Sequence, residues 1–445
     1  MKILNKKVAF KTIGCKVNQY ETGNLRQAFI KNGYNIADFK EKADVYVINT
    51  CAVTKEAERK SKQMIRKAAR LNPSGTIIVT GCGVQANLPE IKDCNHSKYH
   101  IVSNYYKDDI FELFFNSTFE SVKKIIHYKP ANQITRYAEN SFYSTSHRIR
   151  GLIKIQDGCN QFCSYCIIPY LRGRARSRTS KEIFLEINEL ISHNYKEIVL
   201  LGINLGSYGN DLKDENIHLT SLIQKIEKIS GIKRIRLSSI ELPWVTDELI
   251  NAFHHSSKLC HHLHIPLQSG DDHILNLMNR KYNTGQFEKI VKKIKQKIPN
   301  IAITTDVIVG FPGEDDLSFE RSYQFIKRLA FAKIHVFPYS ERLLNLASLL
   351  PGKVETDTIK KRTKKLNDLS KELRKDFFIK NIGQDRTILV EYQGIKNNQN
   401  YTCGLTDNYI QVCIPGAKEK KGQMIKLKLK KVFDSYIEGE KICSC

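Results

Sequence analysis

Three cysteines with the spacing C-x3-C-x2-C carry the clearest chemical signal in this chain of 445 residues. Cys159, Cys163 and Cys166 lie on one short segment, directly after the alternating apolar run 151–156. Three thiolates can hold three irons of a 4Fe-4S cluster, whereas a complete ferredoxin-type set needs four. The fourth iron is then open to a ligand that is not protein, as in catalytic metal sites. The alternative is a zinc site, although zinc loops usually supply four ligands from paired sets.

The first 130 residues alternate strand-like and helix-like segments, as an open α/β sheet does. Residues 8–13, 44–49 and 76–80 are apolar runs typical of buried strands. A basic helix is expected over residues 56–70. This region is therefore predicted to be a parallel sheet with helices.

Further cysteines follow those three strands. Cys15, Cys51 and Cys82 each lie one or two residues beyond a strand end. In a parallel sheet all three would meet at the carboxyl edge, where α/β proteins build their sites. This pattern predicts a second three-cysteine cluster site. The alternative is a set of unrelated buried thiols, which is what we expect for Cys94 and Cys260.

Residues 148–340 repeat a strand–helix unit about six times, which predicts a partial or closed parallel barrel. In such barrels the chemistry lies on loops that follow strands, and the C-x3-C-x2-C loop follows the first one. The expected strands are 149–156, 197–203, 234–239, 262–267, 302–309 and 333–338.

Other loops on the same barrel face carry glycines and polar residues suited to cofactor contacts. Glycine lets the backbone approach a ligand, and Asn, Gln and Glu can pair with ribose and amino-acid groups. Turns use the same residue types, so the shared position of these loops carries the argument. The candidate cofactor-binding residues are Tyr165, Gly202, Asn204, Ser239, Glu241, Gln268 and Gly310.

Two arginines close to the cysteine loop are candidate substrate-binding residues. Arg172 and Arg178 carry guanidinium groups, which pair bidentately with carboxylates and phosphates. The alternative is that both simply lie on the solvated surface.

The sequence pattern changes from helical to strand-like after the lysine-rich helix expected over residues 359–379. Short alternating runs at 387–391, 401–404, 409–412 and 424–430 predict a small all-β module. Its lysines would give a basic face suited to phosphates, unless they form only a solvated strand face. They are Lys418, Lys420, Lys421, Lys426, Lys428, Lys430 and Lys431. The terminal Cys443 and Cys445 are assigned no role.

The overall charge is strongly basic, with 71 Lys and Arg against 46 Asp and Glu and a net charge of +25. Such a balance favours a polyanionic partner such as nucleic acid, the alternative being a merely solvated basic surface. No apolar run approaches the roughly 18 residues of a membrane helix, and the first residues lack a signal core. We therefore expect a cytoplasmic protein whose 12 cysteines are metal ligands or buried thiols rather than disulfides.

The order of these parts resembles the radical S-adenosylmethionine (SAM) methylthiotransferases over nearly the whole chain. The motifs that resemble those of this family are 14–21 (GCKVNQYE), 49–51 (NTC), 81–82 (GC), 169–173 (PYLRG) with 177–178 (SR), 266–270 (PLQSG) and 309–314 (VGFPGE). The segment Leu201-Gly202-Ile203-Asn204 stands where many radical-SAM proteins have Gly-Gly-Glu, as it does in the methylthiotransferases.

The resemblance implies an N-terminal α/β domain over 1–130, a TIM-like (β/α)6 radical-SAM barrel with a helical extension over 145–380, and an RNA-binding TRAM β-barrel over 381–441. It also implies SAM and two 4Fe-4S clusters. The cluster at Cys159, Cys163 and Cys166 would generate a 5'-deoxyadenosyl radical. The second, at Cys15, Cys51 and Cys82, would handle sulfur.

Within the family, the segment 14–21 is similar to the branch that acts on N6-threonylcarbamoyladenosine at position 37 of tRNA, beside the anticodon. The alternative is the isopentenyladenosine branch. A third branch modifies a ribosomal protein, and the basic C-terminal module favours RNA instead. The expected partners are the tRNA anticodon loop, a reductant such as flavodoxin or ferredoxin, and a sulfur donor, with no membrane.

The mechanism that this resemblance implies uses SAM twice. One molecule methylates cluster-bound sulfur, and another yields the radical that takes hydrogen from C2 of the adenine before the methylthio group is inserted. Two other classes remain open from the sequence. One is a cobalamin-dependent radical-SAM enzyme, and the other is a non-catalytic iron–sulfur RNA-binding protein.

Overall fold

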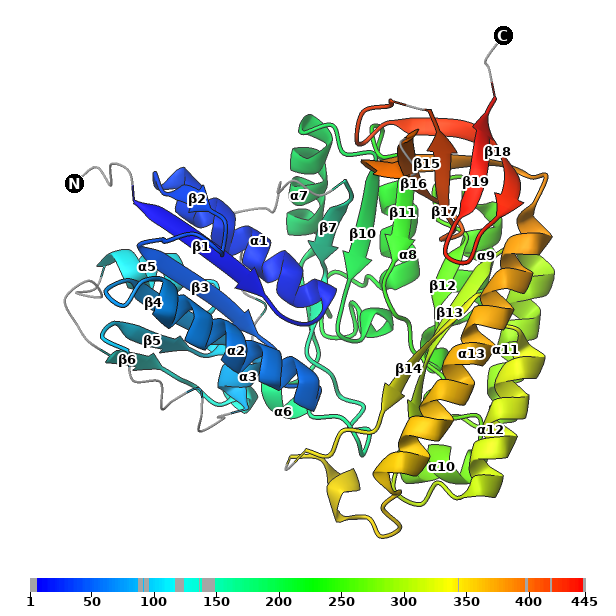
Figure 1. Cartoon of the computed structure of the whole chain (residues 1–445), viewed down its shortest axis with the longest axis horizontal. Helices are drawn as coiled ribbons and strands as arrows, with labels where there is room; N and C mark the ends of the chain where they lie inside the picture. Colours follow the sequence, from blue (N-terminus) through cyan, green and yellow to red (C-terminus); the bar gives the residue numbers. More distant parts are fainter. Residues whose placement is uncertain are drawn as a thin grey trace.

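The computed structural model describes residues 6–86, 91, 96–116, 124–135, 137, 149–342, 344–396, 399–416 and 418–442. Three units follow one another along the chain, namely an N-terminal α/β sheet, a central β/α unit and a small closed β-barrel (Figure 1). Within the described ranges, no helix has both the length and the apolar character needed to cross a membrane. The expectations for Cys94, Cys443 and Cys445 fall outside these ranges.

The N-terminal unit is a six-stranded parallel sheet in the order β2-β1-β3-β4-β5-β6. Every residue of β3 and β4 is buried, because helices cover both faces of a parallel sheet. The strands are β1 (Lys7–Thr12), β2 (Asn35–Ala37), β3 (Val45–Thr50), β4 (Thr76–Gly81), β5 (Tyr99–Val102) and β6 (Lys124–His127). The helices include α1 (Lys16–Lys31), α2 (Lys55–Leu71), α3 (Cys82–Gln85) and α5 (Ile110–Asn116).

The central unit contains six parallel strands in two sheets, β11-β10-β7 and β12-β13-β14. Isolated bridges from Ile235 to Leu259 and from Ser239 to His264 join the two sheets into one partial barrel. The strands are β7 (Gly151–Lys154), β10 (Glu197–Leu201), β11 (Arg234–Leu237), β12 (His262–His264), β13 (Ala302–Val309) and β14 (Lys333–Pro338). All six were predicted from the sequence, two of them with these same bounds.

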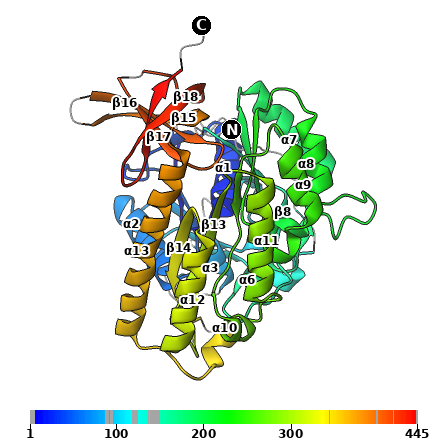
Figure 2. The ribbon, with the colours of Figure 1, turned by 90° about the vertical axis from the view of Figure 1, so that its right-hand side faces the viewer.

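Amphipathic helices cover the outside of this barrel (Figures 1 and 2). In α7, for example, Ile183, Ile187 and Leu190 are fully buried at helical spacing, and the Thr179 hydroxyl caps the first turn. The helices are α6 (Ile168–Arg172), α7 (Ser180–Ser192), α8 (Leu219–Glu227), α9 (Asp247–His255), α10 (Asp272–Leu277), α11 (Thr284–Lys297), α12 (Asp316–Leu329) and α13 (Thr356–Asn381).

The C-terminal unit is a closed five-stranded barrel in the order β15-β16-β17-β19-β18. The long helix α13 lies beside β14, where the Ser370 hydroxyl bonds both backbone groups of Ile334, and leads into this barrel (Figure 2). The strands are β15 (Asp385–Lys396), β16 (Gln399–Thr406), β17 (Gln411–Pro415), β18 (Met424–Val432) and β19 (Ile437–Lys441). The predicted small all-β module is therefore confirmed.

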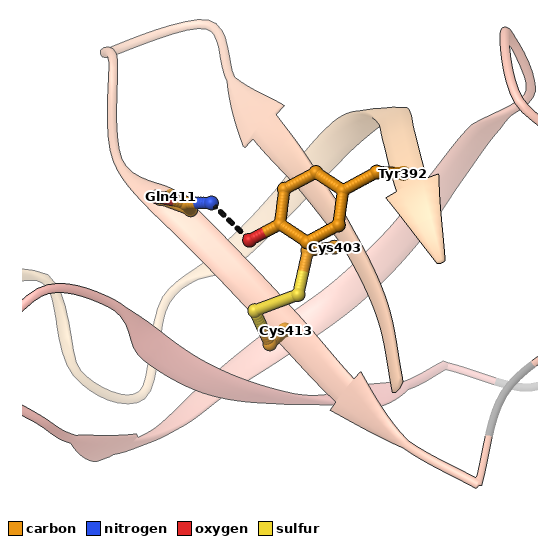
Figure 3. The surroundings of a disulfide bond; sticks show 4 residues. All are labelled: Tyr392, Cys403, Gln411 and Cys413. Carbon is orange, nitrogen blue, oxygen red and sulfur yellow. Dashed lines mark hydrogen bonds between the residues drawn. A yellow bond between two sulfur atoms is a disulfide. The ribbon is translucent and has the colours of Figure 1, made fainter. Parts of the chain in front are cut away.

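One disulfide corrects the expectation that the chain has none. Cys403 on β16 and Cys413 on β17 are directly opposite each other in the antiparallel ladder, with Cα atoms 4.1 Å apart, and their sulfurs are bonded (Figure 3). On the same ladder the Gln411 side chain donates to the Tyr392 hydroxyl at 2.7 Å. This pair was not predicted, because cross-strand register cannot be deduced from cysteine spacing alone.

The C-terminal barrel is fixed to the amino-terminal ends of the central strands. Arg234 donates to the carbonyls of Leu405 and Thr387, and Arg236 donates to those of Thr406 and Asp407. Glu197 neutralises this pair of arginines from the neighbouring strand.

The next residues of the same β16–β17 turn reinforce this attachment. The Tyr409 ring stacks on His262 at 4.2 Å between centroids. This ring stack and the buried arginines together hold the C-terminal barrel against the central unit.

Candidate functional site

Three loops at one edge of the N-terminal sheet carry Cys15, Cys51 and Cys82. They follow the adjacent strands β1, β3 and β4, so the parallel order brings them together. A Cβ atom placed on Gly14 would lie 3.0 Å from the sulfur of Cys51, which shows how closely the first two loops approach. Cys51 and Cys82 are buried, whereas Cys15 is open to solvent.

The charges of these three sulfurs act on one another. Burial, followed by repulsion from the Cys82 sulfur, raises the pKa of Cys51 to about 12. Burial also raises the pKa of Cys15, because protein surrounds it on most sides even though solvent reaches it. Three cysteines at one sheet edge, whose thiolates would repel one another, form a set that a cationic centre would stabilise.

Asn18 holds two of these loops in register. Its side-chain amide donates to the carbonyl of Ile13 at 2.9 Å and to that of Thr50 at 3.0 Å. Those carbonyls lie just before Cys15 and Cys51 respectively. A buried amide on the first turn of α1 thus fixes the spacing of two candidate ligands.

The C-x3-C-x2-C segment lies between the short strand β8 (Gln156–Asp157), which follows β7, and helix α6. The segment turns sharply at Phe162, whose φ is +48°, and backbone amides point at two of the sulfurs. Burial raises the pKa of Cys159 to about 11 and that of Cys166 further. Cys163 is buried and accepts from the Arg280 guanidinium at 3.3 Å.

Residues beside the two cysteine sets meet at the junction of the two units. Cys82 and Ala52, from the N-terminal loops, pack against Ile167 and Leu171, which follow Cys166. The Asn104 side chain donates to the carbonyl of Leu171 at 2.9 Å and ties the same junction. The sequence placed each set at its own sheet edge, and the fold brings the two edges together.

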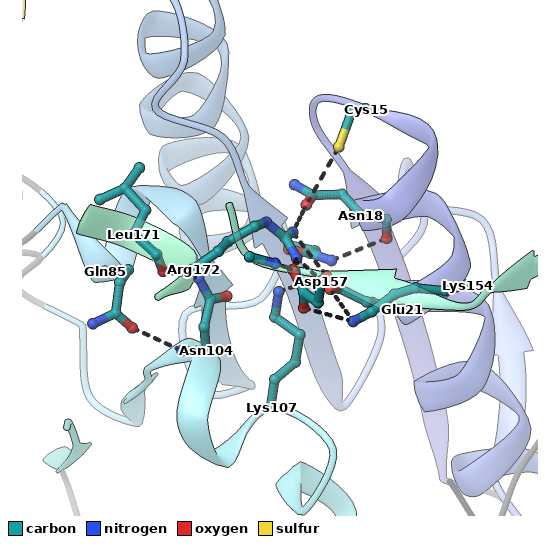
Figure 4. Close-up of polar contacts among 12 residues, drawn as sticks. Cys15, Asn18, Glu21, Gln85, Asn104, Lys107, Lys154, Asp157, Leu171 and Arg172 are labelled. Atoms are coloured by element: carbon teal, nitrogen blue, oxygen red, sulfur yellow. Dashed lines mark hydrogen bonds and ion pairs between the residues drawn. The ribbon is translucent and has the colours of Figure 1, made fainter. Parts of the chain in front are cut away.

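A buried network of charges joins α1 to the central unit beside this junction (Figure 4). The Glu21 carboxylate accepts from Arg172 at 2.8 Å, from Lys107 at 2.6 Å and from Lys154 at 3.0 Å. Asp157 is also paired with Arg172 and Lys154. Although burial opposes ionisation, the surrounding cations hold the pKa of Glu21 and that of Asp157 well below their usual range.

This network corrects the prediction that Arg172 and Arg178 bind substrate. Both guanidinium groups are buried and already paired inside the protein, Arg172 as described and Arg178 with Glu186. Arg178 also donates to the Tyr20 hydroxyl at 3.3 Å. Both arginines do pair with carboxylates, as their guanidinium groups suggested, but those carboxylates belong to the chain itself.

The predicted cofactor residues lie at the carboxyl ends of the central strands, with different surroundings. The backbone amide of Asn204 donates to the Gln156 side-chain oxygen at 2.8 Å. The buried side-chain oxygen of Asn204 has no hydrogen-bond partner within the described residues. Gly202 and Ser239 lie at the ends of β10 and β11, and Ser239 is bridged to β12. Gln268 adopts a φ of +68° at the next turn.

The remaining candidates form a polar cluster around Arg280. This guanidinium forms an ion pair with Glu241 and donates to the Tyr165 hydroxyl at 3.3 Å as well as to Cys163. Arg280 was not among the predicted residues, since it follows a short helix and belongs to no recognisable motif.

Gly310, the last of the predicted cofactor residues, follows strand β13. Its amide donates to Glu314 at 2.9 Å, and an added Cβ would lie 2.3 Å from the Ile359 side chain. With a φ of +75°, this glycine serves the packing of α13 on the barrel.

Strands β12, β13 and β14 bring together three further titratable groups. His264 approaches Asp306 at 3.2 Å, and the His335 ring lies 5.8 Å from that of His264. Burial, followed by the Lys333 charge, lowers the pKa of His335.

Both cysteine sets fit an iron–sulfur cluster by the chemistry of their donors. Each offers three thiols and no fourth protein ligand among the described residues nearby. The unpartnered buried oxygen of Asn204, at the same barrel edge as the C-x3-C-x2-C loop, fits a polar cofactor group that supplies a donor.

Comparison with known proteins identifies two family matches. Residues 7–103 match Uncharacterized protein family UPF0004, and residues 153–326 match the Radical SAM superfamily. A Bacillus subtilis protein named threonylcarbamoyladenosine tRNA methylthiotransferase MtaB is 39% identical over 97% of this chain and 96% of its own. A Clostridium tetani protein named tRNA-2-methylthio-N(6)-dimethylallyladenosine synthase is 34% identical over 97% and 95%.

Among solved structures, the radical SAM methyltransferase TsrM from Kitasatospora setae, with cobalamin and a 4Fe-4S cluster bound, superposes with a TM-score of 0.56. It covers 78% of this chain and 77% of its own at 11% identity, so the likeness concerns the fold alone. The full-length sequence matches are what decide the class. The chain belongs to the radical-SAM tRNA methylthiotransferases, enzymes that use SAM and two 4Fe-4S clusters.

Proposed function

We propose that this enzyme converts N6-threonylcarbamoyladenosine at position 37 of tRNA to its 2-methylthio derivative. Four relatives named for threonylcarbamoyladenosine share 36–39% identity with the chain. Four named as dimethylallyladenosine synthases share 33–34%. The identities favour the first group, and the surroundings of Lys16 provide the physical argument.

Lys16 is the observation that carries this choice. It is exposed directly after the cluster-edge Cys15, and it lines a small cavity together with Leu152 of β7 and Val199 of β10. The threonylcarbamoyl group ends in a carboxylate, whereas an isopentenyl group is wholly apolar. An ammonium group beside the cluster edge would attract that carboxylate, and it offers no favourable contact to an apolar isopentenyl group.

We assign Cys159, Cys163 and Cys166 to the radical-forming cluster and Cys15, Cys51 and Cys82 to the sulfur-handling cluster. When bound, these clusters and SAM supply the radical and the methylthio group. Because Arg280 donates toward the sulfur of Cys163, it would stabilise negative charge on that ligand.

Other residues of the chain hold the site in place. Asn204 would accept from a donor group of SAM, and the Glu241–Arg280 pair would fix the polar side of the same pocket. The network around Glu21 and Arg172 keeps the two cysteine edges adjacent. A flavodoxin or ferredoxin reductant and a separate sulfur donor stay predictions.

Purified, reconstituted enzyme should be given two matched tRNAs, one bearing threonylcarbamoyladenosine and one bearing isopentenyladenosine. Nucleoside mass spectrometry should find the methylthio product only with the first. The opposite preference would leave the enzyme class intact and overturn the substrate assignment.

The role of Lys16 is tested by Lys16→Met, with Lys31→Met at the far end of the same helix as the matched control. Lys16→Met should raise KM for the threonylcarbamoyladenosine tRNA and leave 5'-deoxyadenosine formation in the absence of RNA unchanged. Equal KM values for the two variants would remove Lys16 from substrate recognition.

A further inference from the structure

A cavity of about 1030 Å³ lies between the C-terminal barrel and the amino-terminal edge of the central strands. Lys196 and Lys233 line it from the starts of β10 and β11, and Lys420 and Lys421 line it from the loop before β18. Its described lining residues include no carboxylate. The cavity is therefore strongly positive, and it belongs to two units at once.

A second cavity continues this one toward the cluster edge. Its volume is about 180 Å³, and it shares Ile149 and Lys421 with the first. Its lining ends at Lys16, the residue after Cys15. The one carboxylate along it, that of Glu391, is neutralised by Arg150 at 2.8 Å. Together the two cavities form a groove, here called the lysine groove, that leads from the C-terminal barrel to Lys16 beside Cys15.

The lysines of this groove lie close together with few carboxylates among them. Elsewhere some exposed lysines pair with a neighbouring carboxylate, as Lys360 does with Asp357 and Lys371 with Asp368. In the described part of the chain, none of the four lysines that line the larger cavity forms an ion pair. Four like charges without counter-ions repel one another, and a polyanion that lies along them relieves that repulsion.

We propose that the lysine groove binds the sugar–phosphate backbone of the tRNA substrate. The strand would lie between the two units and direct the anticodon loop past Lys16 toward Cys15. The proposal rests on the tRNA methylthiotransferase activity and is independent of which modified adenosine is the substrate. It places half of the RNA contacts on the central unit, at Lys196 and Lys233, outside the basic C-terminal barrel.

The test compares two pairs of groove variants with a matched control in the full-length, cluster-loaded enzyme. The groove pairs are Lys196→Gln with Lys233→Gln, and Lys420→Gln with Lys421→Gln. The control pair, Lys225→Gln with Lys289→Gln, removes the same charge from exposed lysines on α8 and α11. Fluorescence anisotropy with a labelled, unmodified anticodon stem-loop gives Kd across a series of KCl concentrations.

Each groove pair should raise Kd and lower the slope of log K against log salt by about two, because two phosphate contacts are lost. The control pair should change the slope by much less, and all variants should form 5'-deoxyadenosine as the unaltered enzyme does. Equal Kd and slope for the groove and control pairs would overturn the proposal. So would loss confined to the Lys420 and Lys421 pair, because that result would place the RNA on the C-terminal barrel alone.

The same samples separate this proposal from the substrate assignment. If the unaltered enzyme fails to modify threonylcarbamoyladenosine tRNA while the groove variants bind RNA weakly, the groove stands and the substrate assignment fails. If it modifies that tRNA and the groove variants bind RNA like the control, the substrate assignment stands and the groove proposal fails.

Discussion

Glu21 and Arg172 meet at 2.8 Å although 151 residues separate them in the sequence. Glu21 lies on the helix that starts after Cys15, and Arg172 ends the short helix that follows Cys166. Arg172 also donates to the Asn18 oxygen at 2.7 Å, and Asn18 in turn holds the loops before Cys15 and Cys51. One guanidinium therefore links the two cysteine sets.

Replacement of this carboxylate by its amide, Glu21→Gln, should strongly destabilise the protein. It leaves Lys107, Lys154 and Arg172 buried with less counter-charge, and breaking such a buried pair costs about 3–5 kcal/mol. Urea denaturation followed by circular dichroism should show the loss. Glu56→Gln, which removes an exposed surface pair, serves as the control and should change little. A denaturation midpoint equal to that of the control would contradict the role of the network.

The contribution of Glu21 should depend on pH in a defined direction. Its folded pKa lies well below the value of about 4.3 typical of an unfolded chain. The carboxylate therefore stabilises the fold fully above that value, and the contribution is lost as pH falls through the folded pKa. The stability difference between the unaltered protein and Glu21→Gln should be constant from pH 8 to about pH 5 and shrink below about pH 4, at matched iron content. A difference that stays constant down to pH 3.5 would exclude Glu21 as the titrating group.

The two cysteine sets should bind iron independently. Replacing Cys159, Cys163 and Cys166 together by Ala should leave about half of the iron, because the other set lies on a different sheet. This variant should form no 5'-deoxyadenosine. Iron analysis and chromatography of the reaction would measure both outcomes, and complete loss of iron would show that the sites are not independent.

The second set should separate radical formation from sulfur transfer. A variant with Cys15, Cys51 and Cys82 replaced by Ala should still form 5'-deoxyadenosine with dithionite, because the C-x3-C-x2-C loop and Arg280 are untouched. It should form no methylthio product on tRNA. Absence of 5'-deoxyadenosine from a variant with a native circular dichroism spectrum would refute this division.

The elements with strong local patterns could be predicted from the sequence. Strands β13 and β14 are rich in β-branched residues and are followed by clear turns, and their predicted bounds are correct. By contrast, β2 has three residues and β6 has four, with lysine and histidine at its two ends, so neither stands out locally. Both exist because a neighbouring strand supplies their hydrogen bonds.

The candidate site divides in the same way. Cysteines at strand ends could be located because the edge of a parallel sheet follows from strand order. The partners of Arg172 and Arg178 could not, because long-range ion pairs leave no trace in local spacing. Arg280 and the bond between Cys403 and Cys413 escaped for the same reason.

The attachment of the C-terminal barrel to the central strands sets the distance between its lysines and the cysteines of the N-terminal sheet. Arg234 and Arg236 donate to carbonyls at the end of β16 and in the turn after it, and His262 stacks on Tyr409, so these contacts hold the barrel against the central strands. The path from Lys420 to Cys15 then has a fixed length. An RNA held at one end of that path can present only the nucleotide that lies this far along its strand, so selection of one adenosine among many follows from distance as well as from the shape of the base.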